Sequence, residues 1–108
     1  MSNYKLVVTV PESDADALRE AIGKAGGGKI GNYSHCSFSV QGVGRFLPLE
    51  GANPAIGERG KPEQVVEERI EINCEDSNLK QIIEAIRSNH PYEEPVIDVY
   101  PLYSHDSI

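Results

Sequence analysis

The sequence has few of the features that mark membrane-spanning or exported proteins. It has no tryptophan, two phenylalanines and one methionine among its 108 residues, so its core must be built mainly from Ile, Leu, Val and Ala. No apolar run approaches the ~20 residues that a membrane-spanning helix needs. The first residues lack the basic region and long apolar stretch of an export signal. We therefore expect a soluble, cytoplasmic protein that does not bind membranes.

Cysteine is scarce as well. Cys36 and Cys74 lie far apart and form no CxxC pair, which excludes a zinc ribbon and a thioredoxin-like motif. We expect each to be a small buried residue on a strand, with its thiol reduced.

Positive charge is outnumbered by negative charge. The chain carries 10 Lys and Arg against 17 Asp and Glu, a formal net charge of -7. Such a surface repels phosphate groups instead of neutralising them. We therefore expect no nucleic-acid partner.

Motifs for catalysis are missing. The sequence contains no GxSxG, no Walker loop and no HExxH, and the glycines at 26–28 lack the Lys and Ser or Thr of a phosphate cradle. These glycines are better suited to end a helix and to let another backbone segment approach closely. We predict that the chain is not an enzyme.

Periodic patterns predict both strands and helices. One helix is expected to follow a cap at Ser13 and to end at the glycines 26–28, and a second to follow a cap at Asp76 or Ser77 and to stop before Pro91. Alternation or β-branched composition predicts strands over residues 4–10, 32–41, 45–49, 64–74 and 96–103.

The second strand and the loop after it carry specific expectations. In residues 32–41 we expect Cys36, Phe38 and Val40 to face the core, and Gly42 to Gly44 to turn into the short strand 45–49. Residues 50–62 have no periodicity, but their apolar cluster predicts an ordered loop that lies against a sheet edge.

The order of elements predicts the fold class. It is α+β: a ferredoxin-like βαββαβ sandwich in one domain over residues 1–108, with an antiparallel sheet, two helices on one face and an extra hairpin strand. The other sheet face, expected to carry Tyr33, His35, Val65 and Arg69, is left without cover. Association into a homo-oligomer would shield it.

Three segments carry a family resemblance: IGNYSHCSF at 30–38, LEGANP at 49–54 with the acidic strand 67–71, and HPYEEP at 90–95 with DVYPL at 98–102. Over residues 4–102 the chain resembles the YqfO-type domain. This is the PII-like and CutA-like module found as an insert in the dinuclear-metal-centre hexameric proteins related to the yeast NGG-interacting factor. The resemblance implies a ferredoxin-like fold that trimerises and binds small ligands or metals in clefts between subunits. The two-metal site of full-length relatives lies in flanking domains, so we do not carry its activity over.

The matched segments supply polar residues for ligand binding: His35, Glu50, Asn53, His90, Tyr92, Glu93 and Glu94. Three of these, His90, Glu93 and Glu94, lie in a proline-bracketed turn between the second helix and the last strand, where a rigid backbone would hold side chains in place. Alternatives remain open: packing or an interface role for His35, helix termination for His90, and solvation for the glutamates.

The leading hypothesis is a non-catalytic, oligomeric PII-like binding or regulatory module, with a trimer favoured over a dimer and the ligand undefined. The alternative is a CutA-like binder of a divalent metal through His35, His90 and Glu93. A weaker alternative is a nucleotide hydrolase, because some relatives are labelled as cyclohydrolase homologues. No metal ligands are otherwise assigned.

Overall fold

The computed structural model of the protein describes residues 3–108. Four strands and two α-helices follow one another along the chain. They are β1 (Asn3–Pro11), α1 (Ala15–Lys24), β2 (Phe38–Phe46), β3 (Glu63–Glu75), α2 (Asp76–Asn89) and β4 (Ile97–Leu102), with short 3-10 turns at Glu12–Asp14 and His105–Ser107. Neither α-helix within residues 3–108 is long and apolar enough to cross a membrane.

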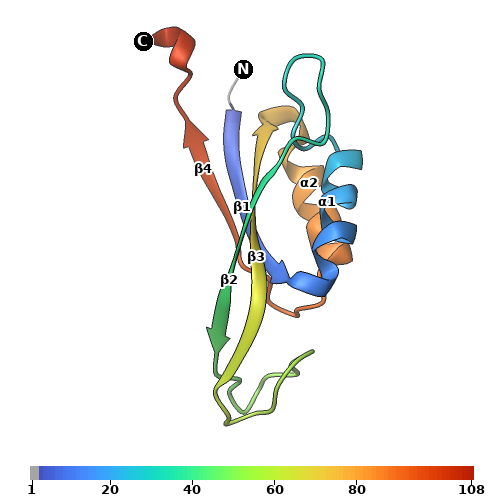
Figure 1. The fold of residues 1–108 in the computed structure, drawn as a ribbon, viewed down its shortest axis with the longest axis vertical. Helices are drawn as coiled ribbons and strands as arrows, with labels where there is room; N and C mark the ends of the chain where they lie inside the picture. Colours follow the sequence, from blue (N-terminus) through green and yellow to red (C-terminus); the bar gives the residue numbers. More distant parts are fainter. Residues whose placement is uncertain (1–2) are drawn as a thin grey trace.

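The strands form one antiparallel sheet in the order β2-β3-β1-β4, and both helices cover the same face of it (Figure 1). This is the βαββαβ arrangement of a ferredoxin-like fold, as the order of elements predicts. Each helix has one apolar stripe, so both must pack on a sheet face to bury it.

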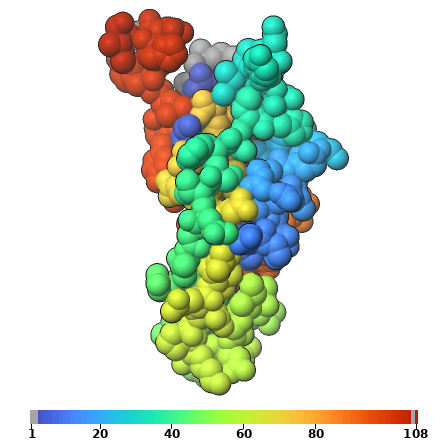
Figure 2. All heavy atoms as spheres, in the orientation of Figure 1, coloured from blue at the N-terminus to red at the C-terminus, as the bar shows by residue number. Residues whose placement is uncertain are grey.

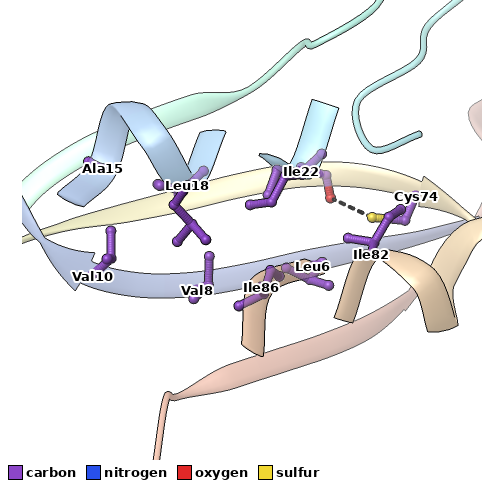
Figure 3. Close-up of a cluster of buried hydrophobic side chains, with 11 residues drawn as sticks. Leu6, Val8, Val10, Ala15, Leu18, Ile22, Cys74, Ile82 and Ile86 are labelled. Atoms are coloured by element: carbon purple, nitrogen blue, oxygen red, sulfur yellow. Dashed lines mark hydrogen bonds between the residues drawn. The ribbon is translucent and has the colours of Figure 1, made fainter. Parts of the chain in front are cut away.

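The hydrophobic core lies between the sheet and the two helices (Figure 3). Pairing in register places Leu6 opposite Ile72 and Val8 opposite Ile70, so the helix-facing side chains of β1 and β3 meet. Fully burying one such aliphatic side chain stabilises the fold by roughly 1.5–3 kcal/mol. The cluster comprises Leu6, Val8, Val10, Ala15, Leu18, Ile22, Ile70, Ile72, Cys74, Ile82 and Ile86.

The two cysteines occupy different environments, and only one is a core residue. Cys74 is buried, whereas Cys36 is half-buried and lies in the loop before β2, so the expectation of a strand position for Cys36 is wrong. Burial raises the pKa of the Cys74 thiol to about 11. The folded protein therefore disfavours the thiolate, which is the reactive form.

We expect iodoacetamide at pH 8 to alkylate Cys36 in the native protein and Cys74 only after unfolding. Because the folded state holds the Cys74 proton more tightly than the unfolded state, stability should also fall as pH rises from about 9 to about 11. Peptide mass spectrometry measures the labelling, with Cys36→Ser as the control that removes the fast reaction. Equal labelling rates at the two cysteines would contradict the burial of Cys74.

Strand β2 differs from the prediction in extent and in orientation. It is one continuous strand, so the extra hairpin strand at 45–49 is absent and Gly42 and Gly44 lie inside β2 instead of in a turn. Phe38 and Val40 are 64% and 45% exposed and do not face the core. Ser39 lies on the helix side instead, where it accepts a hydrogen bond from Arg19 at 3.2 Å. Alternation separates two faces, but a tertiary contact decides which one faces the helices.

The segment before β2 is a loop and not a strand. Paired backbone hydrogen bonds between Ile30 and Tyr33 close it, and His35 has a φ of 61°. Residues 32–37 therefore do not pair with any strand of the sheet. As a consequence, Tyr33 and His35 do not belong to the uncovered sheet face, whereas Val65 and Arg69 of β3 do.

The helix starts lack the predicted side-chain caps, whereas the helix ends agree with prediction. Helix α1 begins after Asp14 and α2 after Glu75, and neither residue bonds the first turn with its side chain. The end of α1 is closed by the Gly27 N–H, which donates to the Ile22 carbonyl at 2.9 Å. Helix α2 stops at Asn89, two residues before Pro91.

Strands β2 and β3 extend beyond the rest of the sheet as a two-stranded arm (residues 43–46 and 63–66). The last β1 residue, Pro11, pairs with Glu67, so the arm has no third strand. The arm and the loop 47–62 at its tip form the lower end of an elongated molecule with extents of 48 × 26 × 23 Å (Figure 2). This geometry places the base of the arm beside the chain segment that joins α2 to β4.

Candidate functional site

A pocket of about 390 Å³ lies where the arm meets the segment between α2 and β4. The arm, the loop that follows β2 and residues 92–96 each provide part of its wall. Its apolar lining includes Phe46, Leu47, Pro48, Ile56 and Val96, and its polar lining includes Arg45, Glu67, Tyr92, Glu93 and Glu94. The pocket thus combines a mainly apolar wall with a small set of charged and hydroxyl groups.

The most buried polar group of the pocket is the carboxylate of Glu67. Glu67 is 8% exposed, and the hydroxyl of Tyr92 donates to its Oε2 at 2.8 Å. A carboxylate this buried needs such a donor, because desolvation of an unpaired charge is costly. Burial, followed by the hydrogen bond to Glu67, raises the pKa of Tyr92 above its usual value. Tyr92 therefore keeps its proton and remains the donor.

Gly44 leaves the space that the Glu67 side chain fills. A Cβ atom at Gly44 would lie 2.2 Å from Glu67 Oε1 and 2.4 Å from its Cδ. Gly44 has no positive φ, so glycine is required there for room and not for backbone conformation. Oε1 of the carboxylate thus lies beside Gly44 of β2, while Oε2 accepts the hydrogen bond of the Tyr92 hydroxyl.

His90 holds Tyr92 in place through the backbone. It directly follows Asn89, the last residue of α2, and its Nε2–H donates to the Thr9 carbonyl at 2.7 Å while its Nδ1 accepts the Tyr92 N–H at 3.1 Å. These partners select the tautomer with the proton on Nε2. The Tyr92 ring also packs edge-on against Phe46, with centroids 5.9 Å apart. His90 acts here as a buried positioning residue.

The loop 50–62 is tied to the segment 92–96, and it shares the pocket with residues 44–46 of the edge strand β2. The Asn53 N–H donates to the Glu93 carboxylate at 2.8 Å, across 40 positions of sequence. The Gly60 N–H of the loop donates to the carbonyl of Pro48, which precedes the loop, at 2.8 Å. Ile56 is half-buried in the pocket wall. The loop therefore closes one side of the pocket.

The structure brings together some of the residues that the sequence singles out. Tyr92, Glu93 and Glu94 line the pocket, and Asn53 contributes a backbone N–H beside it. Glu50 is exposed on the loop and is not part of the lining.

His35 lies at the other end of the molecule. It is packed against Gly23 of α1, with its Nε2 3.9 Å from Glu20 Oε1. It therefore does not meet His90 and Glu93 within one chain. Among residues 3–108, no three His, Cys, Asp or Glu side chains are placed to hold a metal ion together.

Sequence reasoning missed Glu67, because an alternating acidic strand gives no sign of which carboxylate becomes buried. A signal was nevertheless present in β2. Glycine in a strand interior often marks a place where another group approaches closely. Gly44 is such a glycine, and the approaching group is Glu67.

Comparison with known proteins gives relatives over nearly the whole chain. No protein-family model matches. The GTP cyclohydrolase 1 type 2 homolog of Halalkalibacterium halodurans is 50% identical over 101 residues, which cover 94% of this chain and 27% of that protein. The protein of the same name from Bacillus subtilis is 49% identical over 98 residues, covering 91% and 26%. The chain thus spans about a quarter of the length of these relatives.

Solved structures agree with the sequence matches. The Bacillus cereus protein related to NIF3 superposes with a TM-score of 0.83 at 46% identity, covering 95% of this chain and 26% of that chain. CutA from Xylella fastidiosa gives a TM-score of 0.69 at 15% identity, covering 96% and 86%, and GlnK of Bacillus subtilis gives 0.63 at 14%, covering 94% and 82%. These two show likeness of fold alone. The chain is therefore homologous to one segment of the NIF3-related proteins named GTP cyclohydrolase 1 type 2 homolog, and it has the fold shared by CutA and GlnK.

Proposed function

We propose that the chain is a non-catalytic, oligomeric binding or regulatory module of the PII-like and CutA-like kind, and that it takes a small ligand in the pocket beside Glu67 and Tyr92. The observation that carries this proposal is a mainly apolar pocket with a nine-tenths buried carboxylate in its wall. Its volume of about 390 Å³ suits a small organic molecule. Few, well-fixed polar groups in an apolar wall are typical of binding sites.

Two polar residues at the pocket, Tyr92 and His90, favour binding over chemistry. A general base must be free to accept a proton near neutral pH, but Tyr92 keeps its proton and both ring nitrogens of His90 already bond backbone groups, so neither residue is free for that role. We propose that any cyclohydrolase activity of the relatives depends on the three quarters of their length that this chain does not match. A divalent metal at His90 would have to displace one of its backbone partners, so the CutA-like metal alternative is the less favoured one.

Oligomer formation is proposed from the uncovered sheet face. Both helices lie on one face, and the opposite face exposes Phe38, Val40, Tyr100 and Leu102. Strands β2 and β4 are the two edges of the sheet. Association of copies, as a trimer in preference to a dimer, would cover apolar surface and protect these edges. The two free cysteines fit a reducing compartment such as the cytoplasm.

The test is calorimetry with a panel of ligand classes: organic amines, organic acids, ATP, GTP, zinc and copper. We expect one organic class to bind, and Tyr92→Phe to weaken that binding and to lower the free energy of unfolding by about 1–3 kcal/mol, because Glu67 loses its donor. Tyr103→Phe, at an exposed tyrosine outside the pocket, is the matched control. Sedimentation velocity should give a mass above the 11.8 kDa of one chain.

Three results would contradict the proposal. Turnover of GTP by this chain would show catalysis, and an 11.8 kDa species at all concentrations would exclude the oligomer. Failure of every panel member to bind at millimolar concentration would remove the binding function itself.

A further inference from the structure

We infer that the ligand of this pocket is an organic cation, with an ammonium or guanidinium group on an apolar stem. This inference rests on the proposed function and specifies its ligand class. It follows from the charge around the pocket, from one unused oxygen of Glu67 and from the apolar wall.

The pocket is surrounded mainly by negative charge. Glu67, Glu93 and Glu94 line it, and among the described lining residues Arg45 is the only one with a positive charge. The charges of Asp14 and Glu63 also reach the site, since both contribute to the raised pKa of Tyr92. An anionic ligand would meet repulsion here, and a cation would be attracted.

Glu67 offers an acceptor that the protein leaves without a partner. Tyr92 bonds Oε2, whereas Oε1 has no hydrogen-bond partner among residues 3–108. Oε1 is therefore not fully buried. In the described part of the chain, every fully buried side-chain oxygen or nitrogen has a hydrogen-bond partner. An ionised carboxylate can only accept, so the group that completes it must be a donor. A charged N–H donor makes the strongest such bond.

The rest of the pocket suits an apolar stem. Phe46, Leu47, Ile56 and Val96 line the wall beside the carboxylate, and the Tyr92 ring stands next to it. Aliphatic carbons can bury against this wall while the cation reaches Glu67 and the aromatic faces. A compact, strongly hydrated metal ion would use none of this apolar surface.

The cation could come from a free amine or from a Lys or Arg side chain of a second copy. The two sources share the same chemistry at Glu67. They differ in what removal of the Glu67 charge does to the oligomer, because only the second source makes Glu67 part of an interface.

The test is calorimetry with three probes that share one stem: n-hexylamine, 1-hexanol and hexanoate. We expect hexylamine to bind at least about tenfold more tightly than hexanol and hexanoate, because a charge-assisted hydrogen bond contributes that much to affinity. Glu67→Gln should abolish this preference. Glu84→Gln, which removes the same charge from the exposed face of α2, should preserve it. Sedimentation velocity is run on all three proteins.

The outcomes separate the inference from the proposed function. Preference for hexylamine that Glu67→Gln abolishes, with the oligomer unchanged, supports a free organic cation. Weak hexylamine binding in the oligomer, together with dissociation caused by Glu67→Gln and not by Glu84→Gln, supports a side chain of a second copy. Equal binding of the three probes to the wild-type protein, without the dissociation by Glu67→Gln described above, overturns the inference but leaves a binding pocket. If no probe and no member of the wider panel binds, and Glu67→Gln leaves the oligomer intact, both are overturned.

Discussion

Replacing Gly28 by alanine is expected to lower the free energy of unfolding by about 3–5 kcal/mol, the largest single effect that we predict. Gly28 has a φ of +77°, which costs other residues roughly 1–2 kcal/mol. A Cβ atom there would also lie 2.2 Å from the carbonyl oxygen and 2.7 Å from the nitrogen of Cys36. Those are backbone atoms, so no rotamer change can relieve the contact.

The contact cannot open without further loss. The Gly28 N–H donates to the Asn73 carbonyl at 2.8 Å, and the Gly28 carbonyl accepts the Cys36 N–H at 2.9 Å. Together these bonds join the end of α1 to β3 and fold the loop that precedes β2. Moving Cys36 away breaks at least one of them, at about 1 kcal/mol each.

Gly31→Ala is the matched control, because it isolates the cost of backbone conformation. Gly31 has a φ of +56° and no atom within 4 Å of its Cβ position, so we expect a loss of only about 1–2 kcal/mol. Urea unfolding followed by circular dichroism measures both variants. Equal losses of unfolding free energy at the two positions would mean that the contact with Cys36 does not contribute to the cost at Gly28.

Local patterns predicted those elements whose faces are set by the sequence itself. The apolar stripe of α2 and the alternation in β3 place Ile82, Ile86, Ile70 and Ile72 in the core as expected. In each case one face is clearly apolar and the other polar, so burial has only one solution. The fold class follows from these elements and their order.

Strand β2 shows where local reasoning fails. Its residues alternate, but the apolar members Phe38 and Val40 face away from the helices. The helix side is taken by Ser39 and Gln41, which bond Arg19 and Glu12. These partners lie some 20 to 30 residues earlier in the chain, and no window of local sequence contains them. The uncovered apolar face belongs instead to the proposed oligomer interface.

The same limit explains why only part of the candidate site can be predicted from the sequence. Glu93 and Glu94 are predicted because prolines fix the turn around them, and Tyr92 because it lies in a segment that resembles the family; all three line the pocket. Glu67 is not predicted from the sequence. Its burial depends on Tyr92, which is 25 positions away, and on the space above Gly44. A glycine that turns the chain and a glycine that makes room look alike in sequence. The turn predicted at Gly42 and Gly44 is wrong, because both residues lie inside β2.

Gly44→Ala is expected to disable the pocket while the protein stays folded. The new Cβ atom would occupy the position of the Glu67 carboxylate, 2.2 Å from Oε1. The carboxylate is the end of a flexible side chain, so it can swing away, but it then leaves the Tyr92 hydroxyl. Loss of a charged hydrogen bond costs roughly 1.5–3 kcal/mol, and alanine in a strand regains about 0.5–1 kcal/mol. The net loss of stability should be about 1–2 kcal/mol, with hexylamine affinity reduced at least about tenfold.

Gly42→Ala provides a close control, because Gly42 lies two residues away on the same face of β2 and nothing is within 4 Å of its Cβ position. It should stabilise the protein by about 0.5–1 kcal/mol and leave binding unchanged. Introducing Gly44→Ala into a Glu67→Ala background completes a double-mutant cycle. Once the carboxylate is gone, alanine at position 44 has nothing to displace, so its cost should vanish. A cost at position 44 that persists without Glu67 would show that the space above Gly44 is not reserved for that side chain, and the pocket would then lack its buried charge.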